Sequence, residues 1–273
     1  MKRINSNIIT KTIINLCVEA NLNLRRDVLS ALKSACRKEN NSRAKNILGD
    51  IIQNAAIARK ERLAICQDTG MPLVFAEIGQ DVKIIGDLKK AINKGIDKGY
   101  KKASLRNSIV GDPLLRGNSK YSPAVIHIDL VKGNKLKLTV LPKGFGCENK
   151  SALKMFNPTV SIDEVGKFII NTVKAAGPNA CPPYVVGVGI GGTADYACLL
   201  AKKALLRKIR NPKSKLEKDL LASINKLNIG PMGLGGDTTA LAVNIETYPT
   251  HIAGLPVAVN ISCHALRSAT EVL

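Results

Sequence analysis

The chain has 273 residues, of which 45% are hydrophobic, with 41 Lys and Arg against 21 Asp and Glu and a net charge of +20. This length can bury a substantial core, as one large domain or two smaller ones, and the composition is that of a soluble globular protein. No stretch approaches the roughly 18 to 20 uninterrupted apolar residues of a membrane helix, so a membrane protein is not expected.

The high positive charge raises the possibility of a nucleic-acid-binding module. Lys and Arg are nevertheless spread along the whole chain without a continuous stripe, and aromatic residues for base stacking are scarce: four Phe, five Tyr and no Trp. We therefore favour an acidic partner subunit, or a field that attracts dianionic substrates, as the reason for the charge. Nucleic-acid binding remains an alternative.

The N-terminus reads as an amphipathic helix rather than a signal peptide, which predicts a cytoplasmic protein. Seven cysteines are an odd number for a chain without a secretory signal, so reduced thiols or metal ligands are favoured over disulfides. Cys17, Cys36 and Cys198 lie in helical apolar patterns, which indicates a role in packing.

Residues 8–60 carry three helical patterns in succession. The amino-acid composition changes at Leu63, after which Gly and Pro become frequent. Short β-type runs follow at 72–78 and 81–85, and residues 87–103 predict a further helix.

Residues 124–131 and 136–141 flank Lys132-Gly133-Asn134-Lys135, which predicts a β-hairpin. The second of these strands runs into residues 142–150, where we expect a loop whose backbone amides can approach a ligand.

In the remaining chain, Ser161 and Ser214 each open a capping box ahead of a helix, ending near Gly177 and at 228–230. Between them, 184–190 predicts a buried strand and 194–209 a helix, and 255–261 predicts a last strand. These elements favour a single α+β domain, with a helical N-terminal part (1–62) followed by a mixed, largely antiparallel sheet with packed helices (63–273). The second part would bind any cofactor and substrate.

Gly187-Val188-Gly189-Ile190-Gly191-Gly192 matches the glycine pattern of dinucleotide-binding folds. The acidic residue that should follow about 20 positions later, at the end of a second strand, is not found, because 207–217 is a charged helical region. We therefore favour close packing of a strand on a helix, with anion binding at the helix start as an intermediate possibility.

Three cysteines, Cys66, Cys181 and Cys263, lie beside chain breakers or polar residues rather than in apolar runs. Three thiolates from distant loops can hold an iron–sulfur cluster and leave one iron open as a Lewis acid for a hydroxyl and a carboxylate. Cys147, in a Gly-containing loop, is a possible fourth ligand, and a four-thiolate cluster would instead indicate an electron carrier.

Other candidate residues surround these cysteines. Gln67 and Asp68 directly follow Cys66, and His251 and His264 lie near Cys263 in sequence. Arg106 is able to bind a carboxylate bidentately, although sequence alone favours a surface arginine there.

Taken together, these stretches resemble the class I, iron–sulfur-dependent fumarase and tartrate dehydratase family, specifically the α subunit of its two-subunit form. The resemblance runs from Ile65 to the end. Its motifs are Cys66-Gln67-Asp68-Thr69-Gly70, Cys181-Pro182-Pro183-Tyr184 with the following glycines, Gly230-Pro231 to Gly236, and Pro249-Thr250-His251-Ile252-Ala253 to Cys263-His264-Ala265.

The resemblance implies that Cys66, Cys181 and Cys263 ligate a [4Fe-4S] cluster. It further implies that Gln67, Asp68 and Arg106 line the substrate pocket, that an amide near Gly146 contacts a substrate carboxylate, and that His251 acts with Asp68 in proton relay. The chain departs from the family pattern at Phe145 and Cys147, where a Gly and a Ser are usual.

The implied reaction is the reversible dehydration of (S)-malate to fumarate, with L-tartrate dehydration as the alternative. The resemblance also implies a β subunit that supplies the remaining active-site residues, including the base, in a heterotetramer. The α chain alone should then be nearly inactive.

Overall fold

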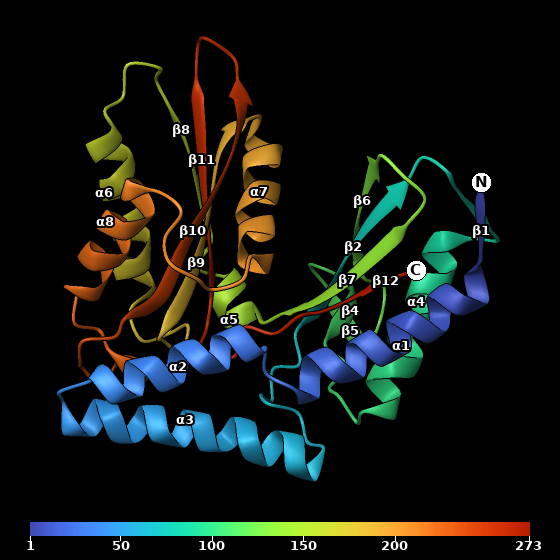
Figure 1. The fold of residues 1–273 in the computed structure, drawn as a ribbon, viewed down its shortest axis with the longest axis horizontal. Coiled ribbons are helices and arrows are strands. Elements are labelled where there is room, and N and C mark those ends of the chain that lie inside the picture. The colour runs from blue at the N-terminus through green and yellow to red at the C-terminus, as the bar shows by residue number, and fades with distance from the viewer. The chain divides into compact units, whose positions relative to one another are not determined.

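A computed structural model describes residues 1–273, and the chain divides into two compact units. The first unit comprises Met1–Arg25, Ala55–Phe145 and Arg267–Leu273, and the second comprises Arg26–Asn54 and Gly146–Leu266. Each unit has its own four-stranded sheet and its own hydrophobic core (Figure 1).

The first unit has a sheet in the order β12-β7-β2-β6, packed against two helices that come from distant parts of the sequence. Its elements are β1 (Lys2–Asn5), α1 (Ser6–Leu22), β2 (Met71–Gly79), β3 (Val82–Ile85), α4 (Leu88–Lys102), β4 (Ile109–Asp112), β5 (Arg116–Lys120), β6 (Val125–Val131), β7 (Leu136–Lys143) and β12 (Ala269–Val272).

Helices α1 and α4 approach each other closely because α4 carries glycine at the contact. A Cβ on Gly95 would lie 2.6 Å from the Cβ of Ile13, and one on Gly99 would lie 2.8 Å from the Cβ of Cys17. Cys17 is fully buried in this core, and burial raises the pKa of its thiol far above the usual range. Its predicted packing role is confirmed.

The hairpin predicted from residues 124–141 is wrong, although both of its strands exist. Strand β2 lies between them, pairing parallel with β6 and antiparallel with β7. The loop between β6 and β7 passes over the end of β2, where the Gly79 amide donates to the carbonyl of Lys135 at 2.8 Å. β2 has a neighbour on each side and is buried along most of its length, as is usual for a central strand whose residues read as a continuous apolar run.

The second unit has a sheet in the order β10-β9-β11-β8, with helices on both faces. Its elements are α2 (Arg26–Lys38), α5 (Phe145–Glu148, beginning at the unit boundary), β8 (Ala152–Phe156), α6 (Ile162–Ala176), β9 (Tyr184–Gly192), α7 (Ala194–Leu206), α8 (Lys215–Asn225), a 3₁₀ turn (Pro231–Gly233), β10 (Ala240–Thr250) and β11 (Leu255–Ser262). Helix α3 (Ser42–Glu61) runs across the boundary between the units.

Strand β9 shows why the glycine pattern is present. Its valines at 186 and 188 belong to the core formed with α6 and α8, while the alternate residues are glycines that face α7. Figure 1 shows α6 and α8 on one side of this sheet and α7 on the other. A Cβ on Gly187 would lie 2.2 Å from the carbonyl oxygen of Ala201, and one on Gly189 would lie 2.0 Å from that of Ala197. Close strand–helix packing therefore accounts for these two glycines.

We expect Gly189→Ala to lower the free energy of unfolding by about 1–3 kcal/mol or more, because the new methyl group would overlap backbone atoms of α7. Gly49→Ala in α3 is the matched control. A Cβ there meets nothing within 4 Å, and removing a helical glycine should stabilise by about 0.5–1 kcal/mol. Urea unfolding of the three chains measures both effects. A Gly189→Ala chain as stable as the wild type would contradict the packing explanation.

The two capping boxes are confirmed. Ser161 Oγ accepts from the amide of Glu164, and Ser214 Oγ accepts from the amide of Glu217, each at 3.2 Å. Helix α6 ends at Gly177, whose φ of 52° suits glycine. Helix α8 ends earlier than expected, at Asn225.

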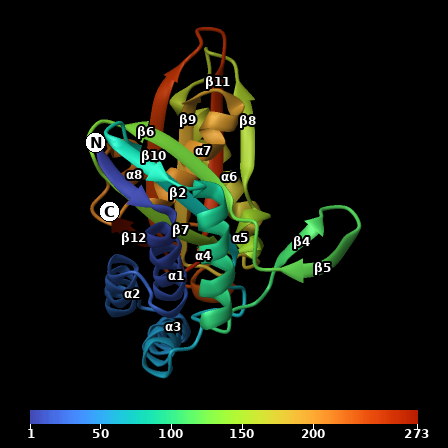
Figure 2. The ribbon, with the colours of Figure 1, turned by 90° about the vertical axis from the view of Figure 1, so that its right-hand side faces the viewer.

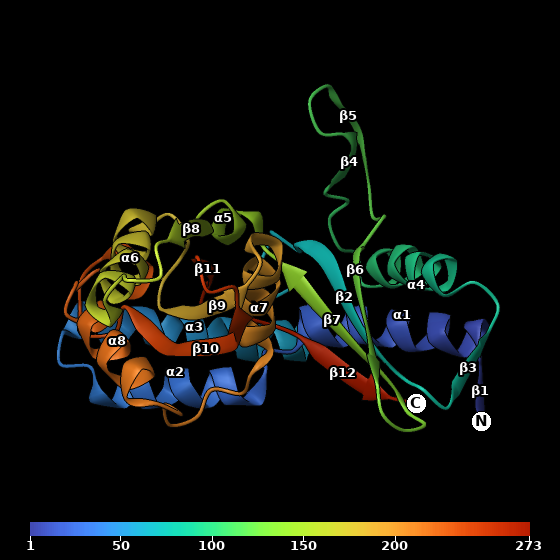
Figure 3. The same cartoon turned by 90° about the horizontal axis from the view of Figure 1, so that it is seen from above.

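Several elements were not predicted from sequence, among them β1, β8, β10 and the two short strands β4 and β5. The last two form an antiparallel arm that extends away from the rest of its unit (Figures 2 and 3). Its tip is built by Asp112, whose Oδ1 accepts from the amides of Leu114 and Leu115 at 2.7 and 2.6 Å.

The predicted α+β class is confirmed, with mixed and largely antiparallel sheets. The parallel pairs are β1/β3, β2/β6 and β9/β10, and the other pairs are antiparallel. The helical N-terminal part is divided, since α1 belongs to the first unit and α2 to the second. The single-domain organisation stays a prediction. None of the helices combines the length and apolar character that crossing a membrane requires.

Candidate functional site

The loop from Cys66 to Gly70 is the centre of the candidate site in the first unit. Asp68 uses both carboxylate oxygens there: Oδ1 accepts from the Gly70 amide at 3.0 Å and Oδ2 from the Phe145 amide at 2.8 Å. A Cβ on Gly144 would lie 3.2 Å from Oδ2. The carboxylate of Asp68 is thus fixed to the chain that follows β7, and glycine at 144 leaves room for it.

Two other predicted residues adjoin this loop. The Cys66 thiol lies 3.6 Å from Oε1 of Gln67, and both side chains are at least partly exposed. Arg106 is held through its backbone: its amide donates to Oγ1 of Thr69 at 3.1 Å, and its carbonyl accepts from the same hydroxyl at 3.2 Å. Cys66, Gln67, Asp68 and Arg106 are therefore brought together, with the Arg106 side chain exposed.

Sequence reasoning missed two buried residues that hold this loop. Arg267, 3% exposed, donates from Nη2 to the carbonyl of Asp68, and its Nε is buried without a hydrogen-bond partner. The Tyr100 hydroxyl lies 3.1 Å from the Thr69 carbonyl oxygen and 3.3 Å from that of Gly70. Burial raises the pKa of Tyr100 far above its usual range, which keeps it a neutral donor. Arg267 lies four residues after the candidate ligand Cys263, and this closeness in sequence could have marked it as a candidate site residue.

In the second unit, Cys181 and Cys263 are brought to one place. The His264 amide donates to the Cys181 carbonyl at 3.3 Å, and Nδ1 of His264 lies 3.1 Å from the same oxygen. Both thiols are half-buried. Cys181 has a φ of 54°, which costs a residue other than glycine of order 1–3 kcal/mol and is typical of functional sites.

Cys147, the possible fourth ligand, lies in the same region. It is buried, and its Sγ donates to the carbonyl of Ala180 at 3.4 Å. Burial raises the pKa of Tyr184 well above its usual range, and the neighbouring thiols of Cys147, Cys181 and Cys263 raise it further. Gly146, in α5, is exposed.

His251 lies elsewhere, in the loop that joins β10 to β11. It is exposed, and its Nδ1 accepts from the Ala253 amide at 3.2 Å. Cys263 follows the other end of β11, an eight-residue strand that spans roughly 25 Å at about 3.3 Å per residue. Figure 1 shows this loop and α5 at opposite ends of the sheet. The structure does not bring His251 to Cys181 and Cys263 of the same chain.

The donor set is suited to an iron–sulfur cluster, which requires thiolate ligands. No group of three or more His, Cys, Asp and Glu side chains is gathered in the structure as a ready metal site. The half-buried, closely spaced Cys181 and Cys263, together with the partly exposed Cys66, are nevertheless chemically appropriate. We conclude that the residues present fit such a group.

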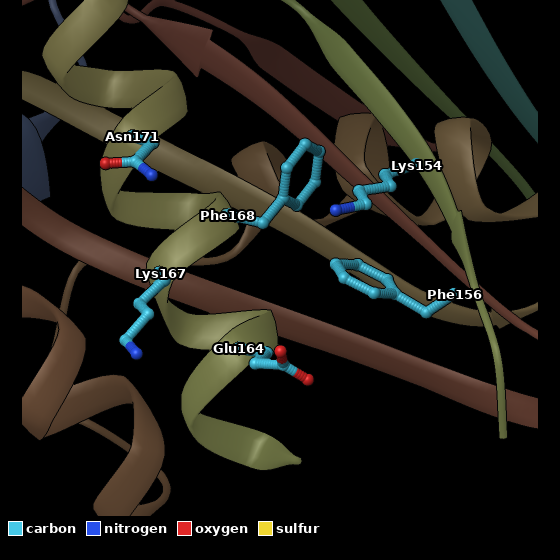
Figure 4. A pocket seen from close by; sticks show the side chains of 6 residues that line it. All are labelled: Lys154, Phe156, Glu164, Lys167, Phe168 and Asn171. Carbon is cyan, nitrogen blue, oxygen red and sulfur yellow. The ribbon is translucent and has the colours of Figure 1, made fainter. Parts of the chain in front are cut away.

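A surface pocket lies between β8 and α6, apart from all these residues (Figure 4). The Lys154 ammonium lies 4.5 Å from the ring centroid of Phe156, which contacts Phe168 edge-on at 5.7 Å. None of the predicted site residues lines it, so it is not part of the candidate site.

Comparison with known proteins gives a consistent result. The family model described as Fumarate hydratase (Fumerase) matches residues 10–272. A Methanocaldococcus jannaschii protein, provisionally named L(+)-tartrate dehydratase subunit alpha, is 44% identical over 96% of both chains. The L(+)-tartrate dehydratase subunit alpha of Escherichia coli K12 is 30% identical over 97% of this chain and 90% of its own length.

These matches define the class of protein first: the chain is part of a hydro-lyase. More particularly, it belongs to the class I fumarate hydratase and tartrate dehydratase family, and it matches relatives named as α subunits over nearly its whole length.

Proposed function

We propose that this chain is the α subunit of an iron–sulfur hydro-lyase, with Cys66, Cys181 and Cys263 as the ligands of a [4Fe-4S] cluster. The main supporting observation is that His264, the residue after Cys263, contacts the Cys181 carbonyl and so brings the two cysteines together, with Cys181 in a strained backbone conformation. In the first unit, Cys66 adjoins a fixed carboxylate and an exposed arginine, the groups that a hydroxy acid needs. Cys147 is left as a packing residue.

When bound, such a cluster supplies an open iron that acts as a Lewis acid toward a hydroxyl group and its adjacent carboxylate. Arg106 would bind a substrate carboxylate through its guanidinium, Gln67 would donate its amide, and the Gly146 amide would contact a carboxylate. Asp68 would act in proton relay, separately from the base that removes the C3 proton.

The substrate we propose is a four-carbon dicarboxylate, with (S)-malate and fumarate as the reacting pair. L(+)-tartrate is the second candidate, because both named relatives carry tartrate dehydratase names. The two reactions share the same dehydration and differ by one hydroxyl group. A net charge of +20 favours the approach of either dianion.

A β subunit completes the active site in this proposal and supplies the base that removes the proton at C3. The complex would be a heterotetramer in the cytoplasm, where its seven free cysteines remain reduced. Because His251 lies far from Cys263 in its own chain, any role in proton relay requires that it reach a site formed by another chain.

The test is the EPR spectrum of the anaerobically purified, reduced α/β complex, recorded alone, with malate and with L-tartrate. We expect a cubane-type signal that shifts with the true substrate, and turnover of that same compound. If the cubane signal does not change with either acid and the cluster is stable in air, the chain would instead be a four-thiolate electron carrier. Absence of a cluster under every reconstitution, with salt-dependent retention on DNA, would favour a nucleic-acid-binding role.

A further inference from the structure

Glu148, the last residue of α5, makes two polar contacts with residues that are distant from it in sequence. Its Oε1 accepts from Nζ of Lys202 in α7, and its Oε2 accepts from Nδ2 of Asn260 in β11 at 3.0 Å. The side chains of Lys202 and Glu148 are only 20% and 23% exposed. Charge-assisted hydrogen bonds in such a place are stronger than neutral ones and hold their partners in a defined geometry.

Asn260 extends this network. It is 3% exposed, and its Nδ2 also donates to Oγ of Ser151 at 2.8 Å, while its Oδ1 is buried without a hydrogen-bond partner. An unsatisfied buried carbonyl is unfavourable, so the polar contacts that hold Asn260 in this place need to offset that cost. Here the Asn260 amide group donates to Glu148, at the end of α5, and to Ser151, in the segment that follows. Asn260 also lies three residues before Cys263.

The residue next to Glu148 makes a contact on the other side. Cys147 donates from Sγ to the carbonyl of Ala180, the residue before Cys181. The short helix α5 is therefore attached through Cys147 to the segment that carries Cys181 and through Glu148 to the strand that leads to Cys263. These two segments also contact each other directly: His264 contacts the Cys181 carbonyl, and Ser262 pairs with Val185 in the sheet.

We propose that Glu148 is a positioning residue that holds α5 between these segments and so fixes the spacing of the Cys181 and Cys263 thiols. The inference rests on the proposed function, since it takes both cysteines as cluster ligands. It also explains Cys147 as part of the same brace, defined here as Cys147, Glu148, Lys202 and Asn260, rather than as a fourth ligand.

The first readout needs no cluster. In the cluster-free full chain, Glu148→Gln should speed amide hydrogen exchange in the segments around Cys181 and 263–266, because the contact at the Cys181 carbonyl loses its support. Glu77→Gln is the matched control: it removes a carboxylate from a Lys–Glu pair of the first unit, where Nζ of Lys137 lies 2.8 Å from Oε1. It should leave exchange in those segments unchanged.

The second readout uses the cluster-loaded α/β complex. Glu148→Gln should lose its cluster in air faster than the wild type, by up to about the 10- to 100-fold by which loss of an outer partner of a metal ligand lowers metal affinity. Lys202→Met removes only the Lys202 contact of Glu148 and keeps the aliphatic part of the side chain. Its effect should be smaller than that of Glu148→Gln. It therefore provides the same test if the Glu148→Gln chain does not fold. Cys147→Ser keeps a donor for the Ala180 carbonyl and should behave like the wild type.

The outcomes separate the two proposals. Wild-type exchange and wild-type cluster decay in Glu148→Gln would overturn the positioning role and leave the hydro-lyase assignment intact. Loss of the cluster in Cys147→Ser, with unchanged hydrogen exchange, would make Cys147 a ligand and also overturn it. A wild-type complex that never holds a cluster would overturn the proposed function, whatever the exchange data show.

Discussion

Replacing Cys181 by Ser in the α/β complex should remove the cluster and lower turnover by more than about 100-fold, the upper end of what losing an outer partner of a metal costs. A serine hydroxyl remains protonated at neutral pH and is a poor iron ligand, so two protein thiolates would have to hold a cluster that needs three. The fold should survive, because serine is similar in size and the His264 contact uses only the backbone of residue 181. Iron content, visible absorbance and turnover measure the effect.

Cys36→Ser is the matched control for this substitution. Cys36, in α2, is only half-buried rather than fully packed as its pattern predicted, and its Sγ donates to the Lys45 carbonyl at 3.6 Å, which a hydroxyl can also do. We expect wild-type iron content and turnover. Full activity in a Cys181→Ser complex that holds no iron would disprove the cluster assignment.

Asp68→Asn should have the second largest effect, with a cluster that is retained and turnover that falls by about 10²- to 10⁴-fold, the usual contribution of a general acid or base. The two oxygens of Asp68 accept from two different amides, so the amide nitrogen of Asn would face one donor. Some local destabilisation is therefore expected as well, of about 1–3 kcal/mol. Turnover against pH, the EPR signal with substrate and the melting temperature distinguish the chemical loss from the structural one.

Asp87→Asn provides a comparison within the same unit. Asp87 caps α4 by accepting from the Lys90 amide at 2.9 Å, and Asn caps helices about as well. This variant should keep its activity and its melting temperature. If Asp68→Asn retained wild-type turnover and pH dependence, Asp68 would have no part in proton transfer.

The local features of the fold could be predicted from the sequence because each depends on nearby residues. Helical periodicity located α1 to α4, and the Ser161 and Ser214 capping boxes are seen as hydrogen bonds within four residues. The hairpin prediction failed because β2, about fifty residues earlier, takes the place between β6 and β7. The pairing of strands so far apart in sequence cannot be recognised from the residues of either strand and its immediate neighbours.

In the candidate site, too, the residues that are adjacent in sequence could be predicted and those that are distant in sequence could not. Cys66, Gln67 and Asp68 could be identified together because they are adjacent in one loop. Arg267 and Tyr100, which hold that loop, reach it from 199 and about 30 residues away and have no common motif with it. His251 shows the opposite case, since it is close to Cys263 in sequence but an extended strand carries the two apart.

The division of the chain into two discontinuous units limits how related α chains can be recombined. The first unit contains both ends of the chain, and the second takes Arg26–Asn54 from within the first half. A chimaera of two homologues joined at any single internal point therefore mixes both parents inside the first unit. Its core, in which α1 packs against the strands and α4, would then be assembled from residues that were never selected together. Exchange of matched segments at two or more junctions is the route by which a hybrid could keep either parental core whole.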